Sequence, residues 1–145
     1  MGENKKKNNV KVEWDLSQIY SNIDELKKDI EKELSLTEKM TTFKGKLNNK
    51  KDIFEFFKTD EEAELISSKT TAYMALRLQK NMKDLEILKL DSEIEPKFKK
   101  LSKQLIFVED ELLENDKELL DDILKDPEFE RFNSNLRYQF ALKGH

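Results

Sequence analysis

The feature that most constrains this chain is the spacing of its apolar side chains, which recur three and four residues apart along most of its length. One such series comprises Leu26, Ile30, Leu34, Thr37 and Met40 or Thr41, and a longer one comprises Leu85, Leu88, Ser92, Ile94, Phe98, Leu101, Leu105, Val108 and Leu112. This spacing places the side chains on one face of a helix. The chain has only 3 Gly and 2 Pro, few of the turn residues that a β-rich fold needs. We therefore predict an all-α fold of about five to six helices, packed as antiparallel hairpins or a bundle.

The length of the chain favours a single domain. A chain of 145 residues buries roughly 68–70% of its unfolded surface, which is enough for a core without disulfides or metals. Residues 1–9 are polar and are predicted to be a disordered tail, so the helical domain should span residues 10–145. Val10, Val12 and Trp14 alternate with charged residues, which indicates an extended N-terminal arm lying on the domain.

Capping residues suggest where the first three helices begin and end. Asn22 or Asp24 should open the first long helix, and Gly45 can adopt the left-handed conformation that ends it. A short helix is predicted over residues 52–58. The Thr59-Asp60-Glu61-Glu62 sequence resembles a capping box, so a separate helix should begin at Thr59 and run to about Lys80.

Two prolines complicate the second half of the chain. Pro96 interrupts the pattern that begins at Asp84 and extends to Leu112, and we expect one kinked helix rather than two separate helices because the period resumes with little phase error. Asn115-Asp116 should cap a short helix over residues 117–125. Asp126-Pro127 should then start the last helix, with apolar side chains at Phe129, Phe132, Leu136 and Phe140.

The residues that could carry chemistry are few. A hydrolytic zinc site needs about three protein ligands and an open position for water, but the chain has one histidine, His145, no cysteine and no HExxH motif. The acidic residues at 109–111 and 121–122 are adjacent, so they point in different directions on a helix and favour a solvated acidic face over a cation site. We predict no catalytic residue and no metal ligand in this chain, and we do not expect it to be an enzyme by itself.

The charge and apolar runs exclude two classes of partner. Against 27 Lys and Arg stand 31 Asp and Glu, a net charge of −4, and no basic stripe offers several contacts to nucleic-acid phosphates. No apolar run approaches the ~20 residues that span a bilayer, and no apolar stretch follows the basic N-terminus as in a signal peptide. A cytoplasmic protein is the expectation, and the absence of cysteine fits a reducing compartment.

Several aromatic residues have both a structural and a functional interpretation. Trp14 and Tyr20 could stack on a ligand, but we favour a role in pinning the N-terminal arm. Phe54 and Phe57 lie in an aromatic segment that should be buried between helices, or could form a docking patch. Tyr73 is expected in the core with its hydroxyl satisfied, although a place on a channel wall or a partner-facing surface is an alternative for Tyr73, Phe54 and Phe57.

Two motifs carry a resemblance to a known family. Trp14-Asp15-Leu16-Ser17-Gln18-Ile19-Tyr20 and, after a helix, Phe43-Lys44-Gly45-Lys46-Leu47 resemble the N-terminal region of oligoendopeptidase F, a bacterial branch of the thimet-oligopeptidase-like zinc peptidases. Weaker similarities are Tyr73, residues 107–113, residues 126–129, and the segment 132–142 that closes in Lys-Gly-His. By this resemblance, the structural anchors are Trp14, Asp15, Leu16, Tyr20 and Gly45.

The resemblance implies a non-catalytic helical lobe that forms part of the wall of a deep channel, which admits short peptides. The zinc, its ligands and the catalytic glutamate would lie in a catalytic lobe that these 145 residues do not contain, so no catalytic or metal residue of the family can be assigned here. The implied partners are that lobe and, through it, short peptides. The alternative is a stand-alone helical protein-interaction module. In either case we expect an exposed apolar patch, through which two copies of the chain could pair.

Overall fold

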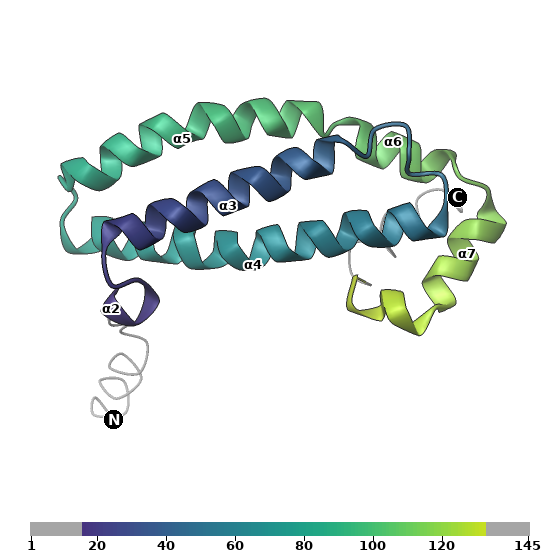
Figure 1. The fold of residues 1–145 in the computed structure, drawn as a ribbon, viewed down its shortest axis with the longest axis horizontal. Coiled ribbons are helices and arrows are strands. Elements are labelled where there is room, and N and C mark those ends of the chain that lie inside the picture. The colour runs from purple at the N-terminus through teal and green to yellow at the C-terminus, as the bar shows by residue number, and fades with distance from the viewer. Residues whose placement is uncertain (1–15, 133–145) are drawn as a thin grey trace, which may run out of the picture.

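The computed structural model describes residues 16–132, and within them the chain is helical with no β-strand (Figure 1). The all-α prediction is therefore confirmed. The helices are α2 (Leu16–Ile19), α3 (Ile23–Thr41), α4 (Lys50–Lys80), α5 (Leu85–Gln104), α6 (Phe107–Glu114), α7 (Lys117–Lys125) and a 3-10 helix, η1 (Pro127–Phe132). Residues 10–14, where an extended arm was predicted, lie outside the described residues, as do the tail 1–9 and the segment after Phe132.

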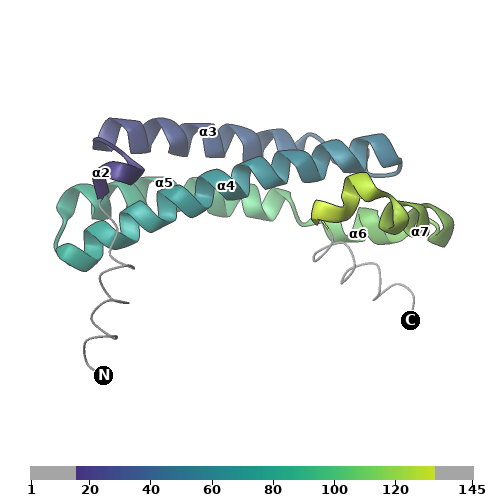
Figure 2. The same cartoon turned by 90° about the horizontal axis from the view of Figure 1, so that it is seen from below.

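Three long helices form the frame of the molecule. In Figure 1, α4 runs back along α3 as the second half of a helical hairpin, and α5 lies alongside the pair; Figure 2 shows α3 on one side of both α4 and α5. The short α2 packs against α4 at one end. Figure 2 shows α6, α7 and η1 gathered at the opposite end.

The buried apolar residues form two clusters, one toward each end of the long helices. The cluster beside α2 consists of Tyr20, Leu26, Ile30, Tyr73, Ile87 and Leu90. The other joins the α3–α4 connection to α6, α7 and η1, and consists of Met40, Phe43, Leu47, Ile53, Phe56, Phe57, Leu112, Leu120, Ile123, Phe129 and Phe132. Each end of the frame is therefore held by its own core.

Side-chain caps fix the beginnings of α3, α5 and α7. The Asn22 side chain accepts a hydrogen bond from the Glu25 backbone N–H at 3.0 Å and so opens α3, as predicted. Asp84 and Asp116 cap α5 and α7 in the same way, as their sequence context indicates. Each cap of this kind stabilises its helix by about 1 kcal/mol.

The predicted helix boundary at Thr59 is wrong. Residues 50–80 form one continuous helix whose cap is Asn49, so the helix predicted over residues 52–58 is part of it. Thr59 is buried, and its hydroxyl donates to the Glu55 carbonyl oxygen at 2.9 Å, as a threonine inside a helix does. The buried face continues in phase from Phe56 through Thr59 to Ala63, so packing of that face outweighs the capping tendency of the threonine.

The prediction for Pro96 is half correct. The helix α5 does run through Pro96 without a break, and the proline is exposed. The helix ends at Gln104, however, instead of continuing to Leu112, and Leu105 closes the turn through its N–H to the Leu101 and Ser102 carbonyl oxygens. The change of direction allows α6 to bring Leu112, which is fully buried, into the second core. Asp126 and Pro127 start a 3-10 helix where an α-helix was predicted.

Gly45 adopts the left-handed backbone conformation that its sequence context predicts, with φ of 80°. A β-carbon at this position would meet no atom within 4 Å, so substitution would strain the backbone without a steric clash. We expect Gly45→Ala to lower the free energy of unfolding by about 1–2 kcal/mol, measured by urea denaturation. Gly45→Asn should lose less, because asparagine tolerates this conformation. Equal midpoints for the wild type and the alanine variant would contradict this account of the turn.

Candidate functional site

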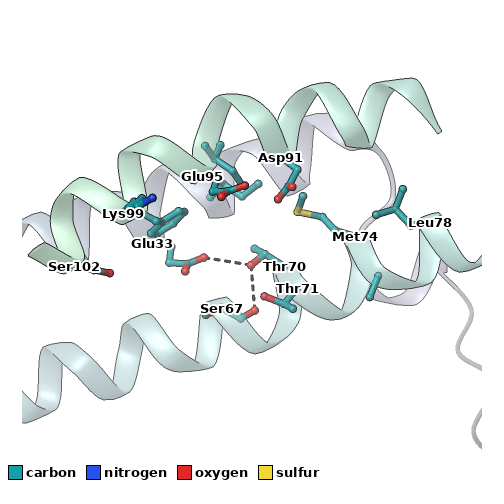
Figure 3. Close-up of a pocket in the computed structure, with 14 residues that line it drawn as sticks. Glu33, Ser67, Thr70, Thr71, Met74, Leu78, Asp91, Glu95, Lys99 and Ser102 are labelled. Atoms are coloured by element: carbon teal, nitrogen blue, oxygen red, sulfur yellow. Dashed lines mark hydrogen bonds between the residues drawn. The ribbon is translucent and has the colours of Figure 1, made fainter. Parts of the chain in front are cut away.

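An open groove of about 670 Å³ lies between α3, α4 and α5, beside the core at the α2 end of the molecule. Figure 3 shows α5 and α4 as its two walls, with Glu33 of α3 pointing into the space between them. The lining residues are Ile30 and Glu33 from α3, Ser67, Thr70, Thr71, Met74, Ala75 and Leu78 from α4, and Asp91, Ile94, Glu95, Phe98, Lys99 and Ser102 from α5.

The two walls are built on the same helical spacing. On α4 the lining residues fall at 67, 70, 71, 74, 75 and 78, and on α5 at 91, 94, 95, 98, 99 and 102. Both series cover three helical turns, which at 1.5 Å per residue is about 16 Å. The groove is therefore linear and follows the helix axes.

The depth of the groove is apolar and its outer edge is charged. Ile30 is buried in the neighbouring core, while Met74, Ile94 and Phe98 are partly buried side chains that pack against that core. The charged lining residues of α5 are all exposed; they are Asp91, Glu95 and Lys99. An apolar interior with a few polar groups is the usual make-up of a ligand or peptide site.

Glu33 is the one acidic side chain among the buried residues of the groove. It is 8% exposed, and its Oε1 lies 3.2 Å from the hydroxyl oxygen of Thr70, which donates to it. The same hydroxyl lies 3.1 Å from the Ser67 carbonyl oxygen, so its single proton serves two acceptors. Among residues 16–132 no lysine or arginine forms an ion pair with Glu33.

Burial raises the pKa of Glu33 above its ordinary value of 4.5, hydrogen bonds from Thr70 and Ser67 offset part of the rise, and the charge of Asp29 adds to it. Because the folded-state pKa is the higher one, the stability linked to this group is complete below the unfolded pKa and is lost as pH rises through the folded pKa.

We expect Glu33→Gln to be more stable than the wild type at pH 7, by an amount on the order of 1 kcal/mol, because the amide removes the buried charge and still accepts from Thr70. Thermal unfolding measured from pH 3.5 to 8 should show that the difference in stability between the variant and the wild type decreases as the pH falls. A variant that is less stable at pH 7 would contradict this reading.

Two of the predicted anchors can be placed in the α2 end of the molecule. Leu16 is partly buried there, and Tyr20 is buried with its hydroxyl donating to Asp29 Oδ2 at 2.7 Å. The Tyr20 ring meets the Tyr73 ring edge-on, with centroids 5.3 Å apart, and burial together with Asp29 raises the pKa of the Tyr20 phenol. Trp14 and Asp15 lie outside the described residues.

The aromatic residues that could have faced a channel or a partner lie elsewhere than the groove. Tyr73 and Phe57 are buried in the two separate cores. Phe54 is partly buried and packs edge-on against Phe129, with the Arg131 guanidinium 5.6 Å from its ring centroid. Phe54 and Phe57 both pack on Phe132, with ring centroids 5.7 and 5.8 Å apart, whereas Tyr73 lies in the other core, so the three residues do not form one surface.

Gly45 is tied to a distant part of the chain. Its backbone N–H donates to Glu111 Oε2 at 2.7 Å, and the Leu47 N–H donates to the other oxygen of the same carboxylate at 3.3 Å. The Asn115 side chain donates to the Leu47 carbonyl oxygen at 2.8 Å. These bonds fasten the α3–α4 connection to α6.

Arg77 fixes the other connection, between the two walls of the groove. Its Nε and Nη2 atoms lie 2.8 and 3.0 Å from the two carboxylate oxygens of Asp84, the cap of α5, and Nη2 also reaches Glu86 at 3.0 Å. The guanidinium holds the pKa of Asp84 below its usual range. A paired fork of this kind has a defined geometry, so it restrains how α4 and α5 diverge.

Sequence reasoning did not identify Glu33 or the groove. The available signal was the position of Glu33, three residues after Ile30 within the apolar stripe of α3, where a carboxylate interrupts the buried face. The spacing of apolar residues in the sequence could not show that a groove separates α4 and α5 beside Glu33.

Comparison with models of known protein families found no match, and searches of curated proteins and of solved structures found no similar protein either. Within residues 16–132, no group of three His, Cys, Asp or Glu side chains is arranged to hold a metal ion. In the same residues, no helix combines the length and the apolar character required to cross a membrane.

Proposed function

We propose that this chain is a non-catalytic helical lobe of a zinc-dependent oligoendopeptidase, and that it forms part of the wall of a channel that admits short peptides. The proposal rests on the resemblance of the motifs Trp14–Tyr20 and Phe43–Leu47 to that family. One observation supports it above the others: each of the two motifs contacts other residues that share the resemblance, one group at each end of the molecule.

The contacts join segments far apart in the sequence. Tyr20, at the end of the first motif, packs on Tyr73. Gly45 and Leu47, in the second motif, both donate to Glu111, which lies in the similar segment 107–113. Phe129, in the segment 126–129, joins the same core as Phe43. Residues that join helices are the ones that a shared fold would require. The scattered similarities fall at two such junctions, one in each core.

In this proposal the chain contributes shape and no chemistry. The long α3–α4 hairpin, held by a core at each end, would give a stiff wall, and the open groove would face the channel or the catalytic lobe. Zinc and the groups that activate water would belong to that lobe, which would be the main partner. We place the enzyme in the cytoplasm as part of the same proposal.

The test is zinc titration calorimetry of the 145-residue chain, together with an assay of its hydrolysis of a quenched nine-residue peptide. We expect neither specific zinc binding nor cleavage, with or without added zinc, because the sequence has no HExxH motif. Zinc-dependent cleavage by this chain alone would overturn the assignment of a non-catalytic role.

A stand-alone interaction module is the second candidate, and one observation favours it. Three large apolar side chains at the α4–α5 turn are strongly exposed, Met82 at 83%, Leu85 at 77% and Leu88 at 42%. Exposed apolar side chains that lie together mark interaction surfaces, and a second copy of the chain could cover them. Under this hypothesis, light scattering at rising concentration would show a dimer that Leu85→Ser disrupts, whereas a strict monomer would count against pairing through this turn.

A further inference from the structure

We infer that the groove between α3, α4 and α5 binds an amphipathic helical segment of a partner protein, and that a lysine or arginine on the apolar face of that segment reaches the Glu33 carboxylate. This inference does not depend on the proposed peptidase role, because it needs only the groove and its charges.

The shape of the groove favours a helix as the occupant. Its two walls present lining residues with matched helical spacing over three turns, from Ser67 to Leu78 and from Asp91 to Ser102. In four-helix bundles a helix packs on such ridges with its axis about 20° from theirs. Three helices with one open face would then become a four-helix arrangement, a common way to bury an apolar helix face.

The charges of the groove favour a basic side chain on that helix. The lining residues include three carboxylates, Glu33, Asp91 and Glu95, and one cation, Lys99, so the lining carries a net charge of −2. At the edge, Asp91, Glu95 and Lys99 are exposed to solvent. Glu33, by contrast, is only 8% exposed. A cation at the bottom of the groove would therefore act mainly on Glu33.

Glu33 is also the group with the most to gain from a cation. Within residues 16–132 its carboxylate has hydroxyl partners and no cation: the Thr70 hydroxyl, which is shared with the Ser67 carbonyl oxygen, and the Ser67 side chain. A buried carboxylate without a cationic partner is costly, and a charge-assisted hydrogen bond is about twice as strong as a neutral one. Arginine fits best, because its long stem can lie along Ile94 and Phe98 while its head reaches the carboxylate.

The experiment measures fluorescence anisotropy of three labelled 15-residue helical peptides against the full 145-residue chain. The peptides share an apolar face of leucine and alanine and differ at one central position, which is arginine, leucine or glutamate. We expect the arginine peptide to bind at least tenfold more tightly than the leucine peptide, and the glutamate peptide to bind weakest.

Two protein variants locate the effect. Glu33→Gln should remove the preference for arginine over leucine, and it is expected to remain folded because the substitution removes a buried charge. Ala75→Trp, which fills an exposed position of the groove, should weaken all three peptides. Glu118→Gln, on α7, is the matched control and should change nothing.

The outcomes decide between occupants. Equal affinity for the three peptides, an arginine preference that survives in Glu33→Gln, or no binding of any peptide at millimolar concentration would each overturn the inference. A groove occupied by a second copy of this chain would show instead as a dimer in sedimentation that Ala75→Trp dissociates, and this result would also overturn it.

Discussion

Replacing Phe57 by alanine should destabilise the protein by about 3–5 kcal/mol, because it empties a large, buried part of the core that joins α4 to η1. Phe57 is 6% exposed, and its ring lies 5.4 Å from that of Phe56 and 5.8 Å from that of Phe132, between centroids. The free energy of unfolding of a domain of this size is about 5–15 kcal/mol, so this substitution would remove a large fraction of it. Urea denaturation followed by circular dichroism measures it.

The matched control is Leu65→Ala on the same helix, since Leu65 is 68% exposed. Its effect on unfolding should stay within about 0.5 kcal/mol. If Phe57→Ala left stability unchanged and instead weakened binding of a partner, Phe57 would be a surface residue, and the packing described for this core would be wrong.

Replacing Glu111 by alanine should lower the free energy of unfolding by about 2 kcal/mol. The carboxylate accepts hydrogen bonds from two backbone N–H groups in the α3–α4 connection, Gly45 at 2.7 Å and Leu47 at 3.3 Å. A hydrogen bond to a charged group contributes about 1.5–3 kcal/mol, and partial exposure of the site places the pair at the lower end. Thermal unfolding should show a lower midpoint, and amide exchange at Gly45 and Leu47 should accelerate.

Two further variants sharpen the test of Glu111. Glu111→Gln keeps one acceptor oxygen and should lose about half as much as the alanine variant. Glu114→Ala, an exposed position on the same helix, should have little effect. Unchanged exchange at Gly45 in Glu111→Ala would show that the connection is held by other contacts.

The sequence predicted what depends on local chemistry. The helical period predicted the fold class. Asn22, one of two candidates, and the Asn115-Asp116 pair were identified as caps because a short polar side chain before an apolar stripe has few other roles. The left-handed Gly45 followed from the same logic. Where the prediction failed, at Thr59, a local capping tendency competed with burial of a long helix face, and tertiary packing prevailed.

The candidate site could not be predicted, because it depends on how far apart two helices lie. Glu33 looks in sequence like one more charged residue of an amphipathic helix, and only the divergence of α4 and α5 places it in a groove. The tie between Glu111 and Gly45 is likewise invisible to spacing, since 66 positions separate the two residues. The family resemblance singled out the segments 43–47 and 107–113, but it did not predict that they are in contact.

The role proposed for this chain, a non-catalytic lobe of a zinc oligoendopeptidase, is tested most directly by a peptidase assay on the complete product of its gene. A quenched nine-residue peptide would be incubated with that product and with the 145-residue chain, each with zinc and with a chelator. The account predicts cleavage only by the complete product in the presence of zinc. Absence of cleavage by the zinc-loaded complete product would contradict the account and favour the interaction module.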